Sequence, residues 1–142
     1  MKVYVDSSFL ISLYSLDSNS ASAAGIMRSS RGDHYITVYG ELEVVNALEL
    51  RVFRKELSVS HARLSLKDFE RDLREGVMQL RSLSDPIFER ARQLSRQTTA
   101  RLGTRTADLL HVAAAVVLEA DCLYTFDQQQ RKLAQAVRLQ TN

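Results

Sequence analysis

Two acidic residues that are distant in sequence, Asp108 and Asp127, are placed where they could act together. Asp108 lies in the first turn of a helix predicted over residues 106–119, and Asp127 directly follows a strand predicted over residues 122–126. Such a helix is roughly 20 Å long at about 1.5 Å per residue, and the strand returns the chain by about 17 Å. We therefore expect both carboxylates at one edge of a sheet.

Two further acids follow predicted strands in the first half of the chain. Asp6 ends a strand predicted over residues 2–5, and Glu43 lies in the first turn of the helix after a strand predicted over residues 35–38. In open parallel sheets, ligands bind outside the carboxyl ends of the strands. We therefore expect Asp6 and Glu43 at the edge that Asp108 also reaches.

Four carboxylates at one edge would repel one another strongly unless a cation lay among them. Oxygen ligands are the preference of Mg²⁺ and Mn²⁺. Sites that combine several acids with such ions support in-line attack of a metal-activated water on phosphodiesters. The acids therefore predict a site for Mg²⁺ (or Mn²⁺) with phosphodiester-cleaving chemistry.

The elements that must position these acids alternate between strands and helices. Only Asp108 and His111 are polar between residues 107 and 118, so this helix belongs in a core. Other helices are predicted over residues 20–31, 41–53, 58–75, 84–100 and 128–135 and after the candidate caps Ser7 and Ser8, and further strands over residues 77–83 and 137–139. This alternation predicts one α/β domain over residues 1–142, with three α/β/α layers and a central parallel sheet of about four to five strands.

Composition is ordinary for a soluble globular domain, with 45% hydrophobic and 25% charged residues. No apolar run reaches the length of a membrane span, and the N-terminus has no convincing cleavage site for a signal peptide. The single cysteine, Cys122, excludes an internal disulfide and suits a reducing compartment. These features predict a cytoplasmic protein, in which Cys122 is an inert core thiol.

Four segments in order along the chain carry a family resemblance: VYVDSSFLISLY, ELEVVNALEL, TADLLHVAAA and LYTFDQQQRKLA. Together they resemble the PIN-domain ribonucleases, and the chain is most similar to the VapC-type toxins of type II toxin–antitoxin systems. The resemblance implies a metal-dependent endoribonuclease that is inhibited by a cognate antitoxin protein and forms a homodimer. It covers nearly the whole length, although no single segment is specific.

The resemblance also assigns roles to individual residues. Asp6, Glu43 and Asp108 match the first three acids of the family pattern, and Asp127 matches the fourth, which is the most variable. Glu41 is an alternative to Glu43, because an acid at a helix start can simply interact with the helix dipole. Asp127 could instead serve as a helix N-cap, or do both. Ser7 and Thr125 match hydroxyls that support the acids, with a cap and a strand position as the simpler readings.

Several other polar residues have two possible readings. Asn46 lies one turn after Glu43 and could hold its carboxylate or bond a neighbouring helix. Arg105, just before the helix of Asp108, is the candidate for RNA phosphate binding and ends an arginine-rich run that contains no acid, residues 90–105. His111 could be a metal ligand, but a buried, hydrogen-bonded histidine explains it better. The other two histidines, His34 and His61, are expected at the surface.

Three functional classes remain open at this stage. One is the toxin just described, and the second is a PIN nuclease that processes RNA without a toxin role. The third is a non-catalytic domain, either a PIN scaffold for binding or a phosphoacceptor. A degenerate scaffold would be expected to lose an acid, and all four are present. The sequence therefore favours catalysis.

Overall fold

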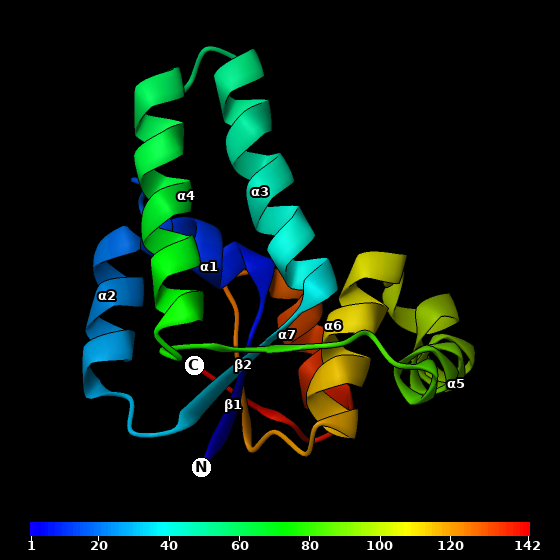
Figure 1. The fold of residues 1–142 in the computed structure, drawn as a ribbon. Helices are drawn as coiled ribbons and strands as arrows, with labels where there is room; N and C mark the ends of the chain where they lie inside the picture. Colours follow the sequence, from blue (N-terminus) through cyan, green and yellow to red (C-terminus); the bar gives the residue numbers. More distant parts are fainter.

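A computed structural model describes residues 1–142 and places a five-stranded parallel sheet at the centre of the molecule (Figure 1). The strands are β1 (Lys2–Val5), β2 (Asp33–Thr37), β3 (Gln79–Arg81), β4 (Cys122–Tyr124) and β5 (Gln140–Thr141). Their order in the sheet is β3-β2-β1-β4-β5, and every neighbouring pair is parallel. The predicted α/β class and strand number are confirmed.

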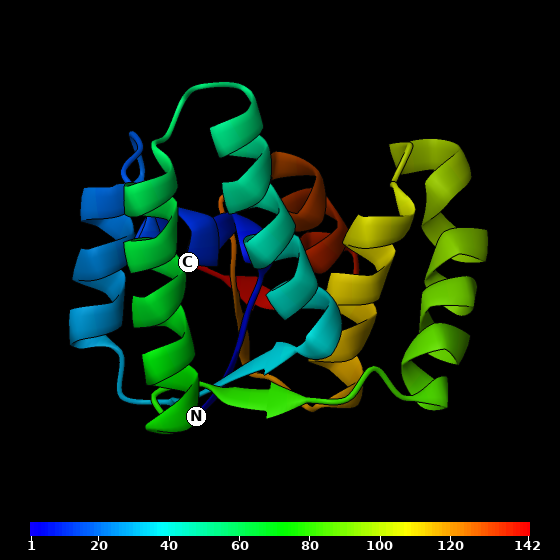
Figure 2. The ribbon, with the colours of Figure 1, turned by 45° about the horizontal axis from the view of Figure 1, so that its top comes forward.

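Helices cover both faces of the sheet and complete the three layers (Figure 2). They are α1 (Ser7–Tyr14), α2 (Ser20–Ser29), α3 (Val38–Phe53), α4 (Val59–Arg74), α5 (Asp85–Leu102), α6 (Thr106–Val117) and α7 (Gln128–Ala136). One apolar cluster joins the sheet to α1, α2, α3 and α4, and a second joins it to α5, α6 and α7. None of these helices combines the length and the apolar character that a membrane span requires.

The central strand β1 supplies both clusters by simple alternation. Val3 and Val5 belong to the cluster under α1–α4, and Tyr4 belongs to the cluster under α5–α7. All three are fully buried. Side chains of a strand alternate between the two faces, so a continuous apolar strand is what a sheet covered on both sides requires.

Helix α6 is buried along most of its length, as its apolar sequence predicts. Every residue from Asp108 to Ala115 is buried. The helix packs between the sheet and α5, and its alanines allow this close approach. Asp108 and His111 are thus held in a core position, where polar groups need partners.

Three helix N-termini meet at the carboxyl edge of the sheet. Asp6, directly after β1, is the N-cap of α1, and Thr37, the last residue of β2, is the N-cap of α3. Asp127, shortly after β4, is the N-cap of α7. The positive ends of three helix dipoles therefore point to one edge, an environment that favours negative charge.

Some details differ from the sequence-based predictions. The last strand is Gln140–Thr141 rather than residues 137–139, because α7 ends at Ala136 and Arg138 then takes a left-handed turn with φ 59°. His34 is buried rather than at the surface, since its Nε2 bonds Ser30 Oγ at 2.8 Å. Cys122 is half-buried rather than enclosed in the core.

Candidate functional site

Asp6 is enclosed by hydrogen bonds at the end of β1. Its Oδ1 accepts from the Phe9 amide (2.9 Å) and the Ser8 hydroxyl (2.7 Å), and its Oδ2 accepts from the Thr125 hydroxyl (2.6 Å). The side chain is fully buried, and this burial raises the pKa of the Asp6 carboxyl. The hydrogen bonds from Thr125, Phe9 and Ser8 act in the opposite direction. The hydrogen bonds therefore fix the position of the Asp6 carboxyl, while burial disfavours its charged form.

The two serines of α1 contact acids instead of capping the helix. The cap is Asp6, because an aspartate one residue earlier competes successfully for the Phe9 amide. Ser8 bonds both oxygens of Asp6 and accepts from the amide of Phe126 at 3.0 Å. Ser7 donates to Glu43 at 3.1 Å. The importance of Ser8 was not recognised from the sequence.

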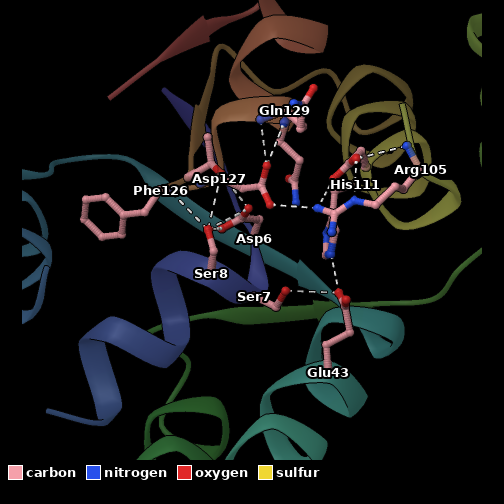
Figure 3. A network of polar contacts seen from close by, with 12 residues as sticks. Asp6, Ser7, Ser8, Glu43, Arg105, His111, Phe126, Asp127 and Gln129 are labelled. Carbon is pink, nitrogen blue, oxygen red and sulfur yellow. Dashed lines mark hydrogen bonds and ion pairs between the residues drawn. The ribbon is translucent and has the colours of Figure 1, made fainter. Parts of the chain in front are cut away.

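Asp108 and Asp127 share the guanidinium of Arg105. Figure 3 shows Arg105 beside Asp127. Arg105 Nε lies 3.2 Å from Asp108 Oδ2, and its Nη2 lies 3.3 Å from Asp108 Oδ1 and 3.0 Å from Asp127 Oδ2. Hydrogen bonding and the charge of Asp108 raise the pKa of Arg105. Asp127 also accepts from the amides of Gln129 and Gln130, so it is both the N-cap of α7 and a partner of Arg105.

Glu43 is held by a histidine from the other side of the sheet. His111 Nε2 makes a short hydrogen bond to Glu43 Oε1, and His111 Nδ1 lies 3.0 Å from the hydroxyl of Tyr4. The Tyr4 hydroxyl in turn lies 3.1 Å from Thr37 Oγ1. His111 is thus a buried partner of an acid. The signal in the sequence was its position as the one polar residue beside Asp108 in an apolar helix.

Of the remaining candidate residues, Thr125 contacts a candidate acid, and Asn46 and Glu41 have no polar side-chain partner. Thr125 is buried, bonds Asp6 and also accepts from the amide of Asp127 at 3.0 Å. Asn46 is exposed and makes no hydrogen bond, so the structure gives it no contact with Glu43. Glu41 lies in the first turn of α3 without a hydrogen bond or ion pair. Of the two glutamates, Glu43 is the one that other polar groups orient.

The charges of the acids also act on two neighbouring tyrosines. Burial raises the pKa of Tyr4, and the charges of Asp6 and Glu43 raise it further. Burial likewise raises the pKa of Tyr39, with Glu43 and Asp108 adding to the effect. Tyr4 is thus influenced by Asp6 and Glu43, and Tyr39 by Glu43 and Asp108.

The donor set fits a hard divalent cation. Its ligating atoms are carboxylate oxygens, and a positive charge, the guanidinium of Arg105, already lies between Asp108 and Asp127. No three acidic, histidine or cysteine side chains converge closely enough to enclose an ion as they stand. The side chain of Arg105 is 66% exposed, so it is free to leave this position.

A polar groove of 340 Å³ opens beside Asp127. Ser8 and Phe126 line it at the acidic edge, and Ser12 and Arg51 line it further along α1. A larger groove of 790 Å³ lies between α1, α2 and α4 and contains none of the four acids. Of the four acids only Asp127 lines the polar groove, whereas Asp6 and Asp108 are buried beneath the surface.

A comparison with protein families decides the relationship of this chain to known proteins. The model of the PIN domain matches residues 3–136. The chain belongs to the PIN domain family. The family resemblance expected from the sequence is confirmed, and with it the three-layer α/β/α fold.

Several solved structures share this fold, and one of them is described as a toxin. VapC20 of Mycobacterium tuberculosis, described as a sarcin–ricin loop cleaving toxin, has a TM-score of 0.71 at 16% identity, over 94% of each chain. FitAcB of Neisseria gonorrhoeae has a TM-score of 0.72 at 15% identity, over 98% of this chain and 95% of that chain. VapBC2 of Rickettsia felis, bound to a promoter DNA fragment, has a TM-score of 0.69 at 15% identity, over 100% and 98%. No curated protein matches the chain significantly.

Proposed function

We propose that this PIN-domain protein is a divalent-metal-dependent endoribonuclease that acts as the toxin of a toxin–antitoxin pair. One observation carries the proposal: Asp6, Glu43, Asp108 and Asp127 lie at the carboxyl edge of the sheet, and Arg105 is the counter-charge of Asp108 and Asp127. Burial raises the pKa of the Asp6 carboxyl, and carboxyls with perturbed pKa values are often found at functional sites. Membership of the PIN family, and the likeness of the fold to VapC20, support this reading.

Asp6, Glu43 and Asp108 would hold Mg²⁺ or Mn²⁺, with Asp127 in support. The ion, when bound, supplies a Lewis acid that lowers the pKa of water and offsets charge on the phosphate. The protein supplies rigid ligands. Thr125 fixes one oxygen of Asp6 in a water-excluded position, so that little reorganisation is needed on binding.

Arg105 is the residue that we propose to contact RNA phosphate. Its guanidinium pairs with Asp108 and Asp127 in this structure, and its side chain is mostly exposed. A cation at the acidic edge would release these carboxylates from Arg105, which could then pair with a phosphate oxygen through the same planar donors. The groove along α1 offers room for the RNA strand next to Asp127.

The proposed partners are RNA and a cognate antitoxin protein, and the proposed assembly is a homodimer. The proposed location is the cytoplasm, where the protein would meet cellular RNAs. Cleavage is expected to leave 5′-phosphate and 3′-hydroxyl ends, as the family resemblance implies.

Cleavage of total cellular RNA by purified protein, freed of any partner, tests the proposal. We expect discrete fragments with Mg²⁺ or Mn²⁺, none with EDTA, and none from Asp6→Ala. Asp33→Ala is the matched control, because Asp33 is exposed and begins β2 at the opposite edge of the sheet. Cleavage that persists in Asp6→Ala would contradict the assigned site.

A separate assay tests the toxin role. Induced expression should arrest bacterial growth, and co-expression of a small protein encoded beside this chain should restore it. RNA cleavage without growth arrest would favour the second functional class, a PIN nuclease in RNA processing. Absence of cleavage with any metal would favour the third, a non-catalytic PIN scaffold.

A further inference from the structure

A series of hydrogen bonds between buried side chains, the hydrogen-bond chain, runs from Thr37, the N-cap of α3, to the carboxylate of Glu43. Thr37 Oγ1 lies 3.1 Å from the hydroxyl of Tyr4, which lies 3.0 Å from His111 Nδ1. His111 Nε2 then meets Glu43 Oε1, as Figure 3 shows for these two side chains. Thr37, Tyr4 and His111 are all at most 1% exposed. Water therefore cannot replace a missing hydrogen-bond partner of Thr37, Tyr4 or His111.

The available donors and acceptors determine the direction in which each hydrogen bond of the hydrogen-bond chain is donated. Thr37 Oγ1 accepts from the amide of Gly40 at 3.3 Å, so its own proton needs an acceptor, and the hydroxyl of Tyr4 is the available one. The Tyr4 proton then goes to His111 Nδ1, which must be unprotonated to accept it. The remaining proton of a neutral imidazole lies on Nε2 and is donated to Glu43. Every donor has an acceptor in this arrangement.

The other protonation states of His111 leave a group unsatisfied. With the proton on Nδ1 alone, the lone pair of Nε2 would face the Glu43 carboxylate. With both nitrogens protonated, the Tyr4 proton would have to go to Thr37 Oγ1, and the Thr37 proton would have no acceptor. A buried polar group without a partner is destabilising, because its lost hydration is not replaced by a hydrogen bond. Of the two neutral tautomers, the one with the proton on Nε2 is therefore favoured by the hydrogen bonds.

Aromatic rings and the start of α3 surround the imidazole of His111. The rings of Tyr4 and Tyr39 lie 5.9 Å and 5.6 Å from the ring of His111, on two different elements. Gly40 approaches so closely that an added Cβ would lie 3.6 Å from His111 Cε1. The N-terminal turn of α3 thus packs against the same imidazole that bonds its own Glu43.

The two carboxylate oxygens of Glu43 have different surroundings. Oε1 takes the hydrogen bonds of Ser7 and His111, and Oε2 makes none within the protein. We propose that His111 is a positioning residue that fixes Oε1 so that Oε2 faces the metal site, and that Tyr4 and Thr37 set the tautomer in which it does so. This inference rests on the proposed function for its purpose, but the hydrogen-bond chain itself is a property of the protein without metal.

The first test uses the metal-free wild-type protein. Nitrogen-15 NMR of histidine-labelled protein at neutral pH distinguishes the two neutral tautomers and the imidazolium by their ring-nitrogen shifts, and a His111→Gln sample assigns the signal. We expect a protonated Nε2 and an unprotonated, hydrogen-bonded Nδ1. A protonated Nδ1, in either the other tautomer or the imidazolium, would overturn the proposal without any dependence on enzymatic activity.

The second test measures Mn²⁺ binding by calorimetry. Tyr4→Phe keeps the imidazole but removes its donor, and we expect a loss of affinity of about 10–100-fold, as is typical for groups that orient metal ligands. Tyr14→Phe is the matched control, because it removes another partly buried tyrosine hydroxyl, bonded to Asp72 at 2.6 Å and outside the site. His111→Gln and the exposed control His61→Gln form the corresponding histidine pair.

The possible outcomes distinguish a failure of the positioning role from a failure of the proposed function. If wild-type protein binds Mn²⁺ and Tyr4→Phe binds it equally well while remaining folded, the positioning role is wrong. If wild-type protein binds no Mn²⁺, the proposed function fails, and the NMR result still decides whether the hydrogen-bond chain has the stated direction. A folded Tyr4→Phe with weaker binding, beside unchanged Tyr14→Phe, supports both.

Discussion

Arg105 Nη2 lies 3.0 Å from Asp127 Oδ2, although 22 residues separate them in sequence. The same guanidinium contacts Asp108, so the acidic edge carries its own counter-charge. This contact joins the start of α6 to the start of α7, across the end of β4. Two functions compete for one side chain, because Arg105 can neutralise the carboxylates or contact a substrate phosphate, but not both at full strength.

Removal of this counter-charge should strengthen metal binding. Arg105 is largely exposed, and exposed ion pairs are worth only about 0.2–1 kcal/mol each. We therefore expect Arg105→Ala to bind Mn²⁺ a few-fold more tightly in calorimetry. Arg101→Ala, at the exposed end of α5 without an ion pair, is the control and should leave affinity unchanged. Weaker binding in Arg105→Ala would show that Arg105 does not compete with the ion.

The phosphate role of Arg105 predicts the opposite change for RNA. Loss of one phosphate contact should weaken RNA binding and reduce the slope of log affinity against log salt by about one. The measurement is binding of a short RNA at several salt concentrations, followed by cleavage under the same conditions. Parental cleavage by Arg105→Ala, with unchanged salt dependence, would remove Arg105 from the substrate site.

Glu43 and Glu41 should separate clearly in a cleavage assay. Glu43 is oriented by Ser7 and His111, whereas Glu41 has no polar partner. Because Glu43 is the proposed ligand itself, Glu43→Gln should lower the cleavage rate by more than the roughly 10–100-fold that supporting groups give. Glu41→Gln should cleave within about twofold of wild type. The reverse order would restore Glu41 as the site acid.

The positions of the acids could be predicted because they depend on topology alone. Asp6 and Asp127 follow strands and Asp108 begins a helix, so the rule for parallel sheets brings them to one edge. The partners of these acids depend on packing between distant elements. His111 and Glu43 lie 68 residues apart, and nothing in their local spacing shows that α6 meets the start of α3.

Local preferences also misled where two residues compete for one role. Ser7 and Ser8 have good cap chemistry, but Asp6 takes the Phe9 amide and leaves both hydroxyls free to contact acids. The polar neighbours of His34 suggest a surface position, yet β2 places it against Ser30 and the ring of Tyr124. Sequence alone does not reveal which competitor succeeds, because the result depends on three-dimensional distances.

The buried charge of Asp6 should make stability depend on pH in the metal-free protein. Burial raises the pKa of Asp6 above its value of about 3.9 in the unfolded chain. The folded state then holds this proton more tightly, so the stabilising contribution is fully present below about pH 4 and is lost as pH rises through the folded pKa. Asp6→Asn removes this loss and should be more stable than wild type at neutral pH.

Urea unfolding at pH 4 and pH 8 measures this effect as the difference between Asp6→Asn and wild type. The difference should grow with pH for Asp6→Asn and stay constant for the exposed control Asp33→Asn. A difference that shrinks as pH rises would mean that the hydrogen bonds from Phe9, Ser8 and Thr125 outweigh burial and lower the pKa of Asp6.

Asp127 has two roles that substitutions can separate. As the N-cap of α7 it accepts from Gln129 and Gln130, and as a carboxylate it pairs with Arg105. Asp127→Ala should lose about 0.5–2 kcal/mol of unfolding free energy, whereas asparagine is as good a cap and should keep it. Both variants lose the negative charge, so both should cleave RNA more slowly if the carboxylate supports the metal. Denaturant unfolding and cleavage, measured on the same samples, give the answer. An Asp127→Asn protein with wild-type stability and full activity would reduce Asp127 to a helix cap, and a site built on Asp6, Glu43 and Asp108 would remain.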